Sequence, residues 1–199
     1  MSEATPTRSV VLEMKDERRA MHEGYVFLDE KCLLLAGEIL RELARYDALR
    51  RHLVAKAGTA GDRLQAAIGR HGLQGLQAYP APRRFDARLV RTPHTLMGVQ
   101  LVDAELQGEA QPALAATDAS SQAEAARRAF SELILAAAPL AAVAGNLARL
   151  SFEYQRSVRR ARALQDVLLP ELDRDVRDLE TRLEELEQED AIWMRQGRA

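Results

Sequence analysis

The sequence predicts a mostly α-helical protein in which two long helices form an antiparallel coiled coil with a small β-hairpin foot between them. Two long stretches repeat apolar residues at alternating steps of three and four, which is the spacing of a coiled-coil seam. The composition agrees, because 47% of the 199 residues are hydrophobic but only 5% are aromatic. Alanine and leucine supply most of the apolar side chains, as is typical of long helices.

The first helix is expected within residues 1–57. Its seam runs from Val11 to Leu53, with apolar residues at most seam positions, and two such stripes bury each other when the chain folds back. Gly24 lies beside the seam and either permits the close approach of a neighbour or is simply tolerated. The four residues Gly58-Thr59-Ala60-Gly61 interrupt the pattern and are expected to end the regular helix, although it could restart there.

The central foot is expected within residues 58–120. It begins with a short helix over Asp62–Arg70, and the glycines and prolines that follow indicate loops. The β-prone segments Phe85–Val90 and Thr95–Val102 predict a hairpin, in which Pro93 would have to lie at the turn or on an edge. Gly108–Ala119, rich in Ala, Gln and Pro, is expected to link the foot to the second helix.

The second helix is expected within residues 121–199. Ser121 and Glu124 have the spacing of a capping box, which satisfies unpaired backbone donors at a helix start. The seam then continues to Leu172, slips by one residue, and resumes as far as Trp193. Pro170 lies beside this slip, and a proline inside a helix removes one backbone hydrogen bond. The sequence therefore predicts a bend at Pro170, in a bent and asymmetric shaft.

Composition and motifs argue against several classes of protein. The net charge is −2, which does not suggest nucleic acid or an acidic membrane surface as a partner. The single cysteine, Cys32, rules out an internal disulfide and occupies a seam position. No secretory signal is evident, and the four histidines are far apart. With no phosphate-binding loop or dinucleotide-binding turn, we expect no catalytic residues, metal or cofactor.

Two features of the second helix have more than one interpretation. Leu133–Ala148 is apolar nearly all round, so it either packs on the chain's own foot or binds a partner protein. This uncharged run is too short to span a bilayer. An arginine-rich band, Arg149–Arg162, precedes an acid-rich band, Asp166–Asp190. These bands are either a solvated surface or two collars that contact different partners.

The charged residues on the two seams suggest a register for the coil. Arg18 interrupts the first seam and Asp190 the second, with opposite charges. Pairing them would also place Glu42 opposite Gln165, within a turn of Arg162. The alternative is that Arg18 extends outward along its aliphatic stem.

Three segments resemble the D subunit of V-type and archaeal-type ATPases and ATP synthases. Arg159–Pro170 resembles the family's "RRVNALE..VIP" signature, although Arg162 stands where the family usually has Asn and Gln165 where it has Glu. Leu96-Met97-Gly98-Val99 resembles its central "MGV" segment.

The amino-terminal region is also similar to this family. Pro6-Thr7-Arg8, with Gly24–Lys31 beyond it, resembles the pattern "PT(K/R)…G..LLK.K", with Asp29 replacing a usual lysine. The three segments occur in the family's order, and the similarity covers essentially the whole chain.

The resemblance implies a non-catalytic central rotor shaft, which transmits torque between ATP hydrolysis or synthesis and the movement of protons or other ions. Its termini would enter the hexamer of A and B subunits, and its lower part would bind the F subunit and rest on the C or d subunit above the membrane ring. This location is cytoplasmic and peripheral to the inner or plasma membrane, with no inserted segment. The residues expected at the shaft tip are Met14, Arg18, Arg19, Leu186, Asp190 and Trp193. Those expected to bind the F subunit are Tyr46, Leu49, Leu53, Leu133, Leu140 and Leu147. Pro170 is the expected shaft kink, and Met97, Gly98 and Val99 belong to the foot.

Two other classes of protein also pair long helices. A prefoldin-like holdase chaperone does so around β-hairpins, but the open ends of its coils should be apolar, whereas the stretch near Trp193 is rich in acids. A coiled-coil scaffold or export-apparatus adaptor is the second alternative. Identification of co-purifying subunits would distinguish the three.

Overall fold

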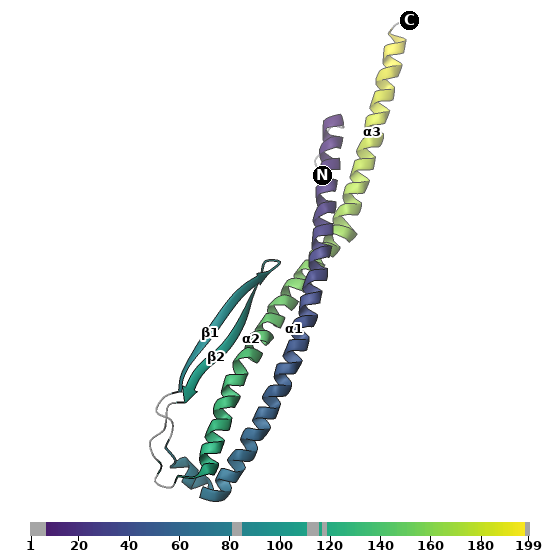
Figure 1. Ribbon diagram of the computed structural model, residues 1–199. Helices are drawn as coiled ribbons and strands as arrows, with labels where there is room; N and C mark the ends of the chain where they lie inside the picture. The colour runs from purple at the N-terminus through teal and green to yellow at the C-terminus, as the bar shows by residue number, and fades with distance from the viewer. Residues whose placement is uncertain (1–6, 81–84, 111–115, 117–118, 198–199) are drawn as a thin grey trace. The chain divides into compact units, whose positions relative to one another are not determined.

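A computed structural model describes residues 7–80, 85–110, 116 and 119–197, with backbone only at 85, 86, 109 and 110. The elements follow in the order α1 (Arg8–Gln77), β1 (Phe85–Leu96), β2 (Val99–Ala110), α2 (Ser121–Ala163), the π-helical turn η1 (Leu164–Leu168) and α3 (Leu169–Gln196) (Figure 1). The predicted class, long helices with one small antiparallel hairpin, is confirmed.

The chain divides into two compact units. The terminal unit combines Met1–Leu35 with Tyr154–Ala199, and the hairpin unit comprises Ala36–Glu153. Long helices pass from one unit into the other. The packing inside each unit is described separately below.

Helix α1 does not end at the glycines where the sequence indicated a break. It continues through Gly58 and Gly61, so Asp62–Arg70 is part of α1 and not a separate helix. Ala60 and Ala67 are both fully buried in this segment. Their packing outweighs the cost of about 1 kcal/mol per helical glycine. The helical geometry first breaks at Gly72, which has φ 68° and ψ 164°.

In the terminal unit, the start of α1 runs antiparallel to α3 and is tied to it by ion pairs. Arg8 Nη2 lies 2.7 Å from Glu187 Oε1, and Lys15 Nζ lies 2.5 Å from Glu180 Oε1. The paired residues are seven apart on each helix, as are flanking positions of a coiled-coil seam. Val11, Leu35, Ala161 and Val176 are buried in this unit. Charge pairs along one flank and apolar burial along the seam therefore specify the antiparallel pairing together.

The register predicted from the seam charges is wrong. Arg18 pairs with Asp173 rather than Asp190, a difference of more than four helical turns. Glu187 already faces Arg8, the first residue of α1, so Asp190 has no residue of α1 opposite it. Glu42 lies beside Asn146, whose Nδ2 is 3.4 Å from Glu42 Oε2, and so it does not face Gln165. Exposed charges on flexible side chains contribute too little to decide the register.

A charge swap tests the contribution of the Lys15–Glu180 pair. Lys15→Glu should lower the free energy of unfolding by about 1 kcal/mol or less, because both side chains are substantially exposed. The double variant Lys15→Glu/Glu180→Lys should recover most of this loss. Chemical denaturation at low and high salt measures both effects, and salt at about 1 M should remove most of the difference. A coupling energy that does not change with salt would contradict a screened surface pair.

A π-helical turn precedes Pro170. The N–H of Leu169 donates to the carbonyl of Leu164, a bond across five residues, and Pro170 itself has no N–H to donate. Such a turn accommodates one extra residue, which matches the one-residue slip of the seam near Leu172. The discontinuity read from the sequence at Pro170 therefore corresponds to a π-turn in the backbone.

The two twelve-residue strands pair from Phe85 with Ala110 to Leu96 with Val99, as one antiparallel hairpin in the hairpin unit. Met97 and Gly98 form its two-residue turn, with φ values of 46° and 84°. Positive φ at both positions matches a type I′ turn, which suits the twist of paired strands. Pro93 lies in mid-strand opposite Val102 and not at the turn. It is tolerated because both strands of a two-stranded sheet are edges.

The start of α2 is capped one residue earlier than predicted. Ser120 Oγ, and not Ser121, accepts the backbone N–H of Ala123 at 3.2 Å. His71 from α1 contacts the same hydroxyl, with its Nε2 at 2.5 Å. The predicted linker is partly strand, because Gly108–Ala110 belongs to β2. Residues 111–115 and 117–118 of that linker lie outside the described residues.

Candidate partner-binding surfaces

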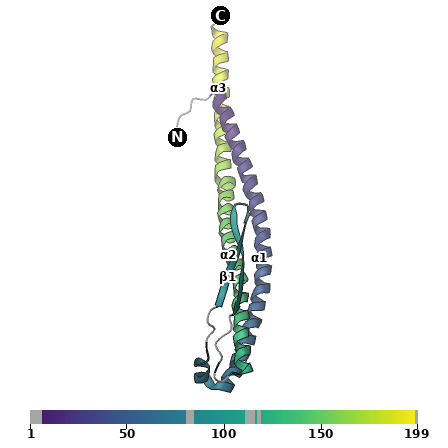
Figure 2. The same cartoon turned by 60° about the vertical axis from the view of Figure 1, so that its left-hand side comes forward.

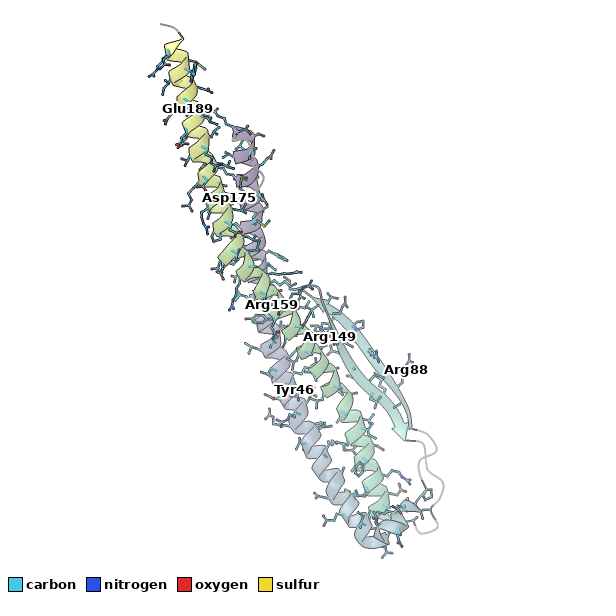
Figure 3. The ribbon with its side chains drawn as sticks, turned by 180° about the vertical axis from the view of Figure 1, so that it is seen from behind. Tyr46, Arg88, Arg149, Arg159, Asp175 and Glu189 are labelled. Carbon is cyan, nitrogen blue, oxygen red and sulfur yellow. The ribbon has the colours of Figure 1, made fainter. Side chains whose placement is uncertain are left out.

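The carboxyl end of α3 extends past the first turn of α1 within the terminal unit. Beyond the Arg8–Glu187 pair, α3 continues to Gln196, and Glu189 lies on this extension (Figure 3). The acids Glu189 and Asp190 on this extension are followed by the exposed apolar residues Ile192, Trp193 and Met194. Trp193 is 75% exposed, and a large exposed aromatic residue is typical of a surface that binds another protein.

The predicted tip residues fall into two groups in the terminal unit. Leu186, Asp190 and Trp193 are exposed on α3. Arg18 and Arg19 are exposed on α1, where Arg18 is paired with Asp173 and Arg19 lies 3.9 Å from Asp16. Met14 is half-buried. The two groups are separated along the unit. Arg18 lies level with Asp173, whereas Leu186 lies beside Glu187, which pairs with Arg8 at the start of α1.

The six residues predicted to bind the F subunit all belong to the hairpin unit and are all half-buried. They are Tyr46, Leu49, Leu53, Leu133, Leu140 and Leu147. Figure 3 shows Tyr46 on α1. The seam pattern did not indicate the more exposed apolar residues beside them, because it marks only positions that face the partner helix. Leu43, Val54, Phe130 and Ile134 are these exposed neighbours.

The apolar run of α2 is only partly covered. The continuous helical stretch Ser121–Gln196 contains an 18-residue window with mean hydropathy 1.7, of which 17% is buried. By length and composition this window could cross a membrane, contrary to what the uncharged run suggested. A single window of this kind is weak evidence for a span, because helices of soluble proteins pass the same test. Val143 and Leu150 are fully buried, so one side of this run faces the interior of its own unit.

Asn146 forms hydrogen bonds that join α2 to the hairpin. Its Oδ1 accepts the N–H of Val102 at 2.9 Å, and its Nδ2 donates to the Val102 carbonyl at 3.1 Å. Arg149 Nη2 donates to Asn146 Oδ1 at 2.7 Å. Glu42 of α1 is only 7% exposed beside it.

Arg45 of α1 provides a second tie to the hairpin. Its Nη1 lies 2.6 Å from Asp103 Oδ1, and this contact with the carboxylate raises the pKa of the guanidinium above its ordinary value. On the other strand, His94 Nδ1 lies 3.7 Å from Asp103 Oδ2. The Arg45–Asp103 pair therefore ties β2 to α1, while the His94–Asp103 contact joins the two strands to each other.

The described side chains do not suggest a metal or catalytic centre. Among them, no group of three or more His, Cys, Asp or Glu residues could hold a metal ion. Burial raises the pKa of the Cys32 thiol above its usual value, and the neighbouring Asp29 raises it further. A thiol with a raised pKa stays protonated at neutral pH and is a poor nucleophile.

The charge bands are partly used inside the terminal unit. Asp173, Glu180 and Glu187 of the acid-rich band pair with residues of α1. The arginines Arg159, Arg160 and Arg162 are exposed on α2. The acid-rich band therefore contributes to the coil itself, and the exposed arginines remain a surface for other contacts.

Comparison with known proteins agrees with this architecture. A family model described as the D subunit of ATP synthase matches residues 10–196. The chain belongs to this family.

Members of this family are central-stalk subunits of rotary ATPases, and the chaperone and scaffold alternatives are not favoured. The D subunit of the A-type ATP synthase of Methanopyrus kandleri is 26% identical over 198 residues, covering 98% of this chain and 85% of the relative. That of Pyrococcus furiosus is 25% identical, covering 98% of this chain and 92% of the relative. The D subunit of the V-type ATP synthase of Thermotoga neapolitana is 21% identical, covering 96% and 94%.

Proposed function

We propose that this D subunit is the rotor shaft that carries torque between the A/B hexamer of a rotary ATPase and its ion-carrying membrane ring. The family match along nearly the whole chain carries this proposal. The antiparallel helix pairing supports it, because long helices held by seam packing and flanking ion pairs resist relative sliding. ATP would bind in the hexamer, so this chain needs no nucleotide site of its own.

The exposed end of α3 suits entry into the hexamer. It carries several acidic residues and the exposed Trp193. Different sides of the tip therefore present negative charge or an apolar ring to the surrounding subunits. A rotating element can bias several sites among different conformations only if its contacts with them differ. We propose that the tip residues, from Leu186 to Trp193 with Met14, Arg18 and Arg19 on α1, provide these unequal contacts.

The apolar surface of the hairpin unit suits a permanent partner. Ile134, Val54 and Leu43 are exposed there, around the half-buried residues Tyr46 and Leu140. Exposed apolar residues gathered in one region mark protein-binding surfaces. We propose that the F subunit binds here, and that the foot with Met97, Gly98 and Val99 contacts the C or d subunit. In this arrangement the chain is cytoplasmic and peripheral to the membrane.

Reconstitution tests the proposed function. The purified full-length chain should show no ATP turnover by itself, and it should co-purify with A, B and F subunits from the same source. Adding it to the A/B hexamer with the F subunit should give hydrolysis that drives rotation, observed with a bead attached to the shaft. A hexamer that rotates a bead equally well on an unrelated coiled coil would contradict a specific shaft role. Turnover by the isolated chain would also contradict it.

A further inference from the structure

Asn146 is an unusual residue for its position. It is the only asparagine of the chain, it is fully buried, and it lies in the most apolar part of α2. Asparagine is a poor helix former, and an unpaired buried amide is costly. Its place here therefore requires compensating hydrogen bonds, and the structure provides four.

These four bonds use the full capacity of the side-chain amide. The oxygen accepts from the Val102 N–H and from Arg149, and the nitrogen donates to the Val102 carbonyl and to Glu42. A side-chain amide has two donors and two acceptor positions. The amide thus occupies the edge of β2 in the way that the backbone of a neighbouring strand would.

The opposite strand leaves Val102 dependent on this side chain. Val102 and Pro93 form a non-hydrogen-bonded pair of the ladder, so the N–H and the carbonyl of Val102 point away from β1. Both backbone polar groups of Val102 are bonded to α2 instead. Its neighbour Leu101 faces His94 in the ladder. Pairs alternate along an antiparallel ladder, so Leu101 and His94 bond to each other across the strands.

The remaining attachment of the hairpin is small. Among its described side chains only Val99 and Leu101 are buried. Near the turn, an open surface depression of about 370 Å³ is lined by residues of both the hairpin and α2, namely Gly98, Val99, Ala148, Arg149, Phe152 and Glu153. Figure 1 and Figure 2 show the hairpin lying along α2, and Figure 3 shows Arg149 on the part of α2 beside it. Two apolar side chains near the turn and the polar contacts of Asn146 and Asp103 thus make up the attachment of the hairpin to the helices.

We propose that Asn146 is a latch, and that the hairpin leaves and rejoins α2 as a folded ladder when this latch opens and closes. Release exposes few apolar residues, and water can replace the polar contacts of Asn146, Glu42 and Asp103. The strand-to-strand ladder lies within the hairpin, so opening the latch does not itself break it. The latch stands on the contacts of the hairpin unit alone and does not rest on the proposed rotor function.

Hydrogen exchange by NMR on the full-length chain tests the latch. In the wild type, release without unfolding makes the Val102 amide exchange faster than the Leu101 amide. Asn146→Asp keeps the volume but removes both donors and brings a carboxylate towards Glu42. Asn146→Leu removes all four bonds and keeps the site filled. Both variants should raise the exchange rate of Val102 by about tenfold or more, while Leu101 stays protected.

A second measurement and a matched control complete the test. Spin labels on Gln100→Cys and Ala148→Cys, in a Cys32→Ala background, should show a longer and broader distance distribution in the Asn146 variants. Ala144→Asp adds a carboxylate at an exposed position of the same helix and should change neither readout. An equal increase in the exchange rates of the Val102 and Leu101 amides would show that the hairpin unfolds instead. An unchanged exchange rate of the Val102 amide would contradict the proposed latch. If the Asn146→Asp variant loses helicity, the exchange rates of the Asn146→Leu variant decide the test. If both variants lose helicity, Asn146 is a core residue and the proposal is overturned.

Discussion

Replacing Leu35 by alanine is expected to lower the free energy of unfolding by about 2–5 kcal/mol. Leu35 lies on the first seam and is fully buried, so truncation removes apolar contacts and leaves a cavity that the helices only partly close. The slightly better helix propensity of alanine does not compensate for this loss. Urea denaturation followed by circular dichroism measures the change, with the slope of the transition checked for constancy.

Leu33→Ala is the matched control for this prediction. Leu33 is two residues away on the same helix and is 69% exposed, so the same chemical change should alter stability by about 0.5 kcal/mol or less. Similar losses at both positions would contradict the assignment of Leu35 to the seam. A stable variant at Leu35 together with a destabilised one at Leu33 would place the seam on the other face of α1.

Replacing Ile134 by aspartate is expected to weaken the binding of the F subunit by about 100-fold or more, or roughly 2.7 kcal/mol. Ile134 is 48% exposed in the apolar run of α2, so the isolated chain should keep its helicity. If the F subunit covers this residue, the complex must bury an unpaired carboxylate, which costs several kcal/mol. Val54→Asp on α1 should act in the same direction. Titration calorimetry with the purified F subunit measures the dissociation constant.

Leu73→Asp is the control for the docking surface. Leu73 is also exposed and apolar, but it lies outside the proposed docking region, so this variant should bind the F subunit as the wild type does. If Ile134→Asp and Val54→Asp retain full affinity and full helicity, the F subunit binds elsewhere, and the foot around Met97–Val99 is then the next surface to test.

Several features of this D subunit follow from local sequence patterns alone. The heptad spacing of residues such as Val11 and Leu35 predicts long coiled-coil helices, because the periodicity of apolar residues determines which face of a helix is buried. Pro170 and the seam slip near Leu172 mark the discontinuity that the backbone takes as a π-turn. The hairpin was predicted as well, from the β-prone segments on either side of Pro93, but its turn lies at Met97 and Gly98, inside the segment expected to be the second strand.

Local patterns were less reliable where two small energies competed. The glycines at 58 and 61 indicated a helix end, but α1 continues because Ala60 and Ala67 pack in the interior. Neighbouring serines at 120 and 121 are both good caps, and only the folded backbone shows that Ser120 accepts the Ala123 N–H. In each case the local preference is about 1 kcal/mol, which tertiary packing readily exceeds.

Only the tertiary structure determined the register and the role of Asn146. The seam charges suggested Arg18 with Asp190, but Arg18 reaches Asp173, because an exposed ion pair is worth too little to align two helices against the packing of their apolar seams. Asn146 is a polar residue within an apolar stretch of α2. Its function depends on Val102, 44 residues away, and a hydrogen bond between distant segments leaves no periodic signal in either of them.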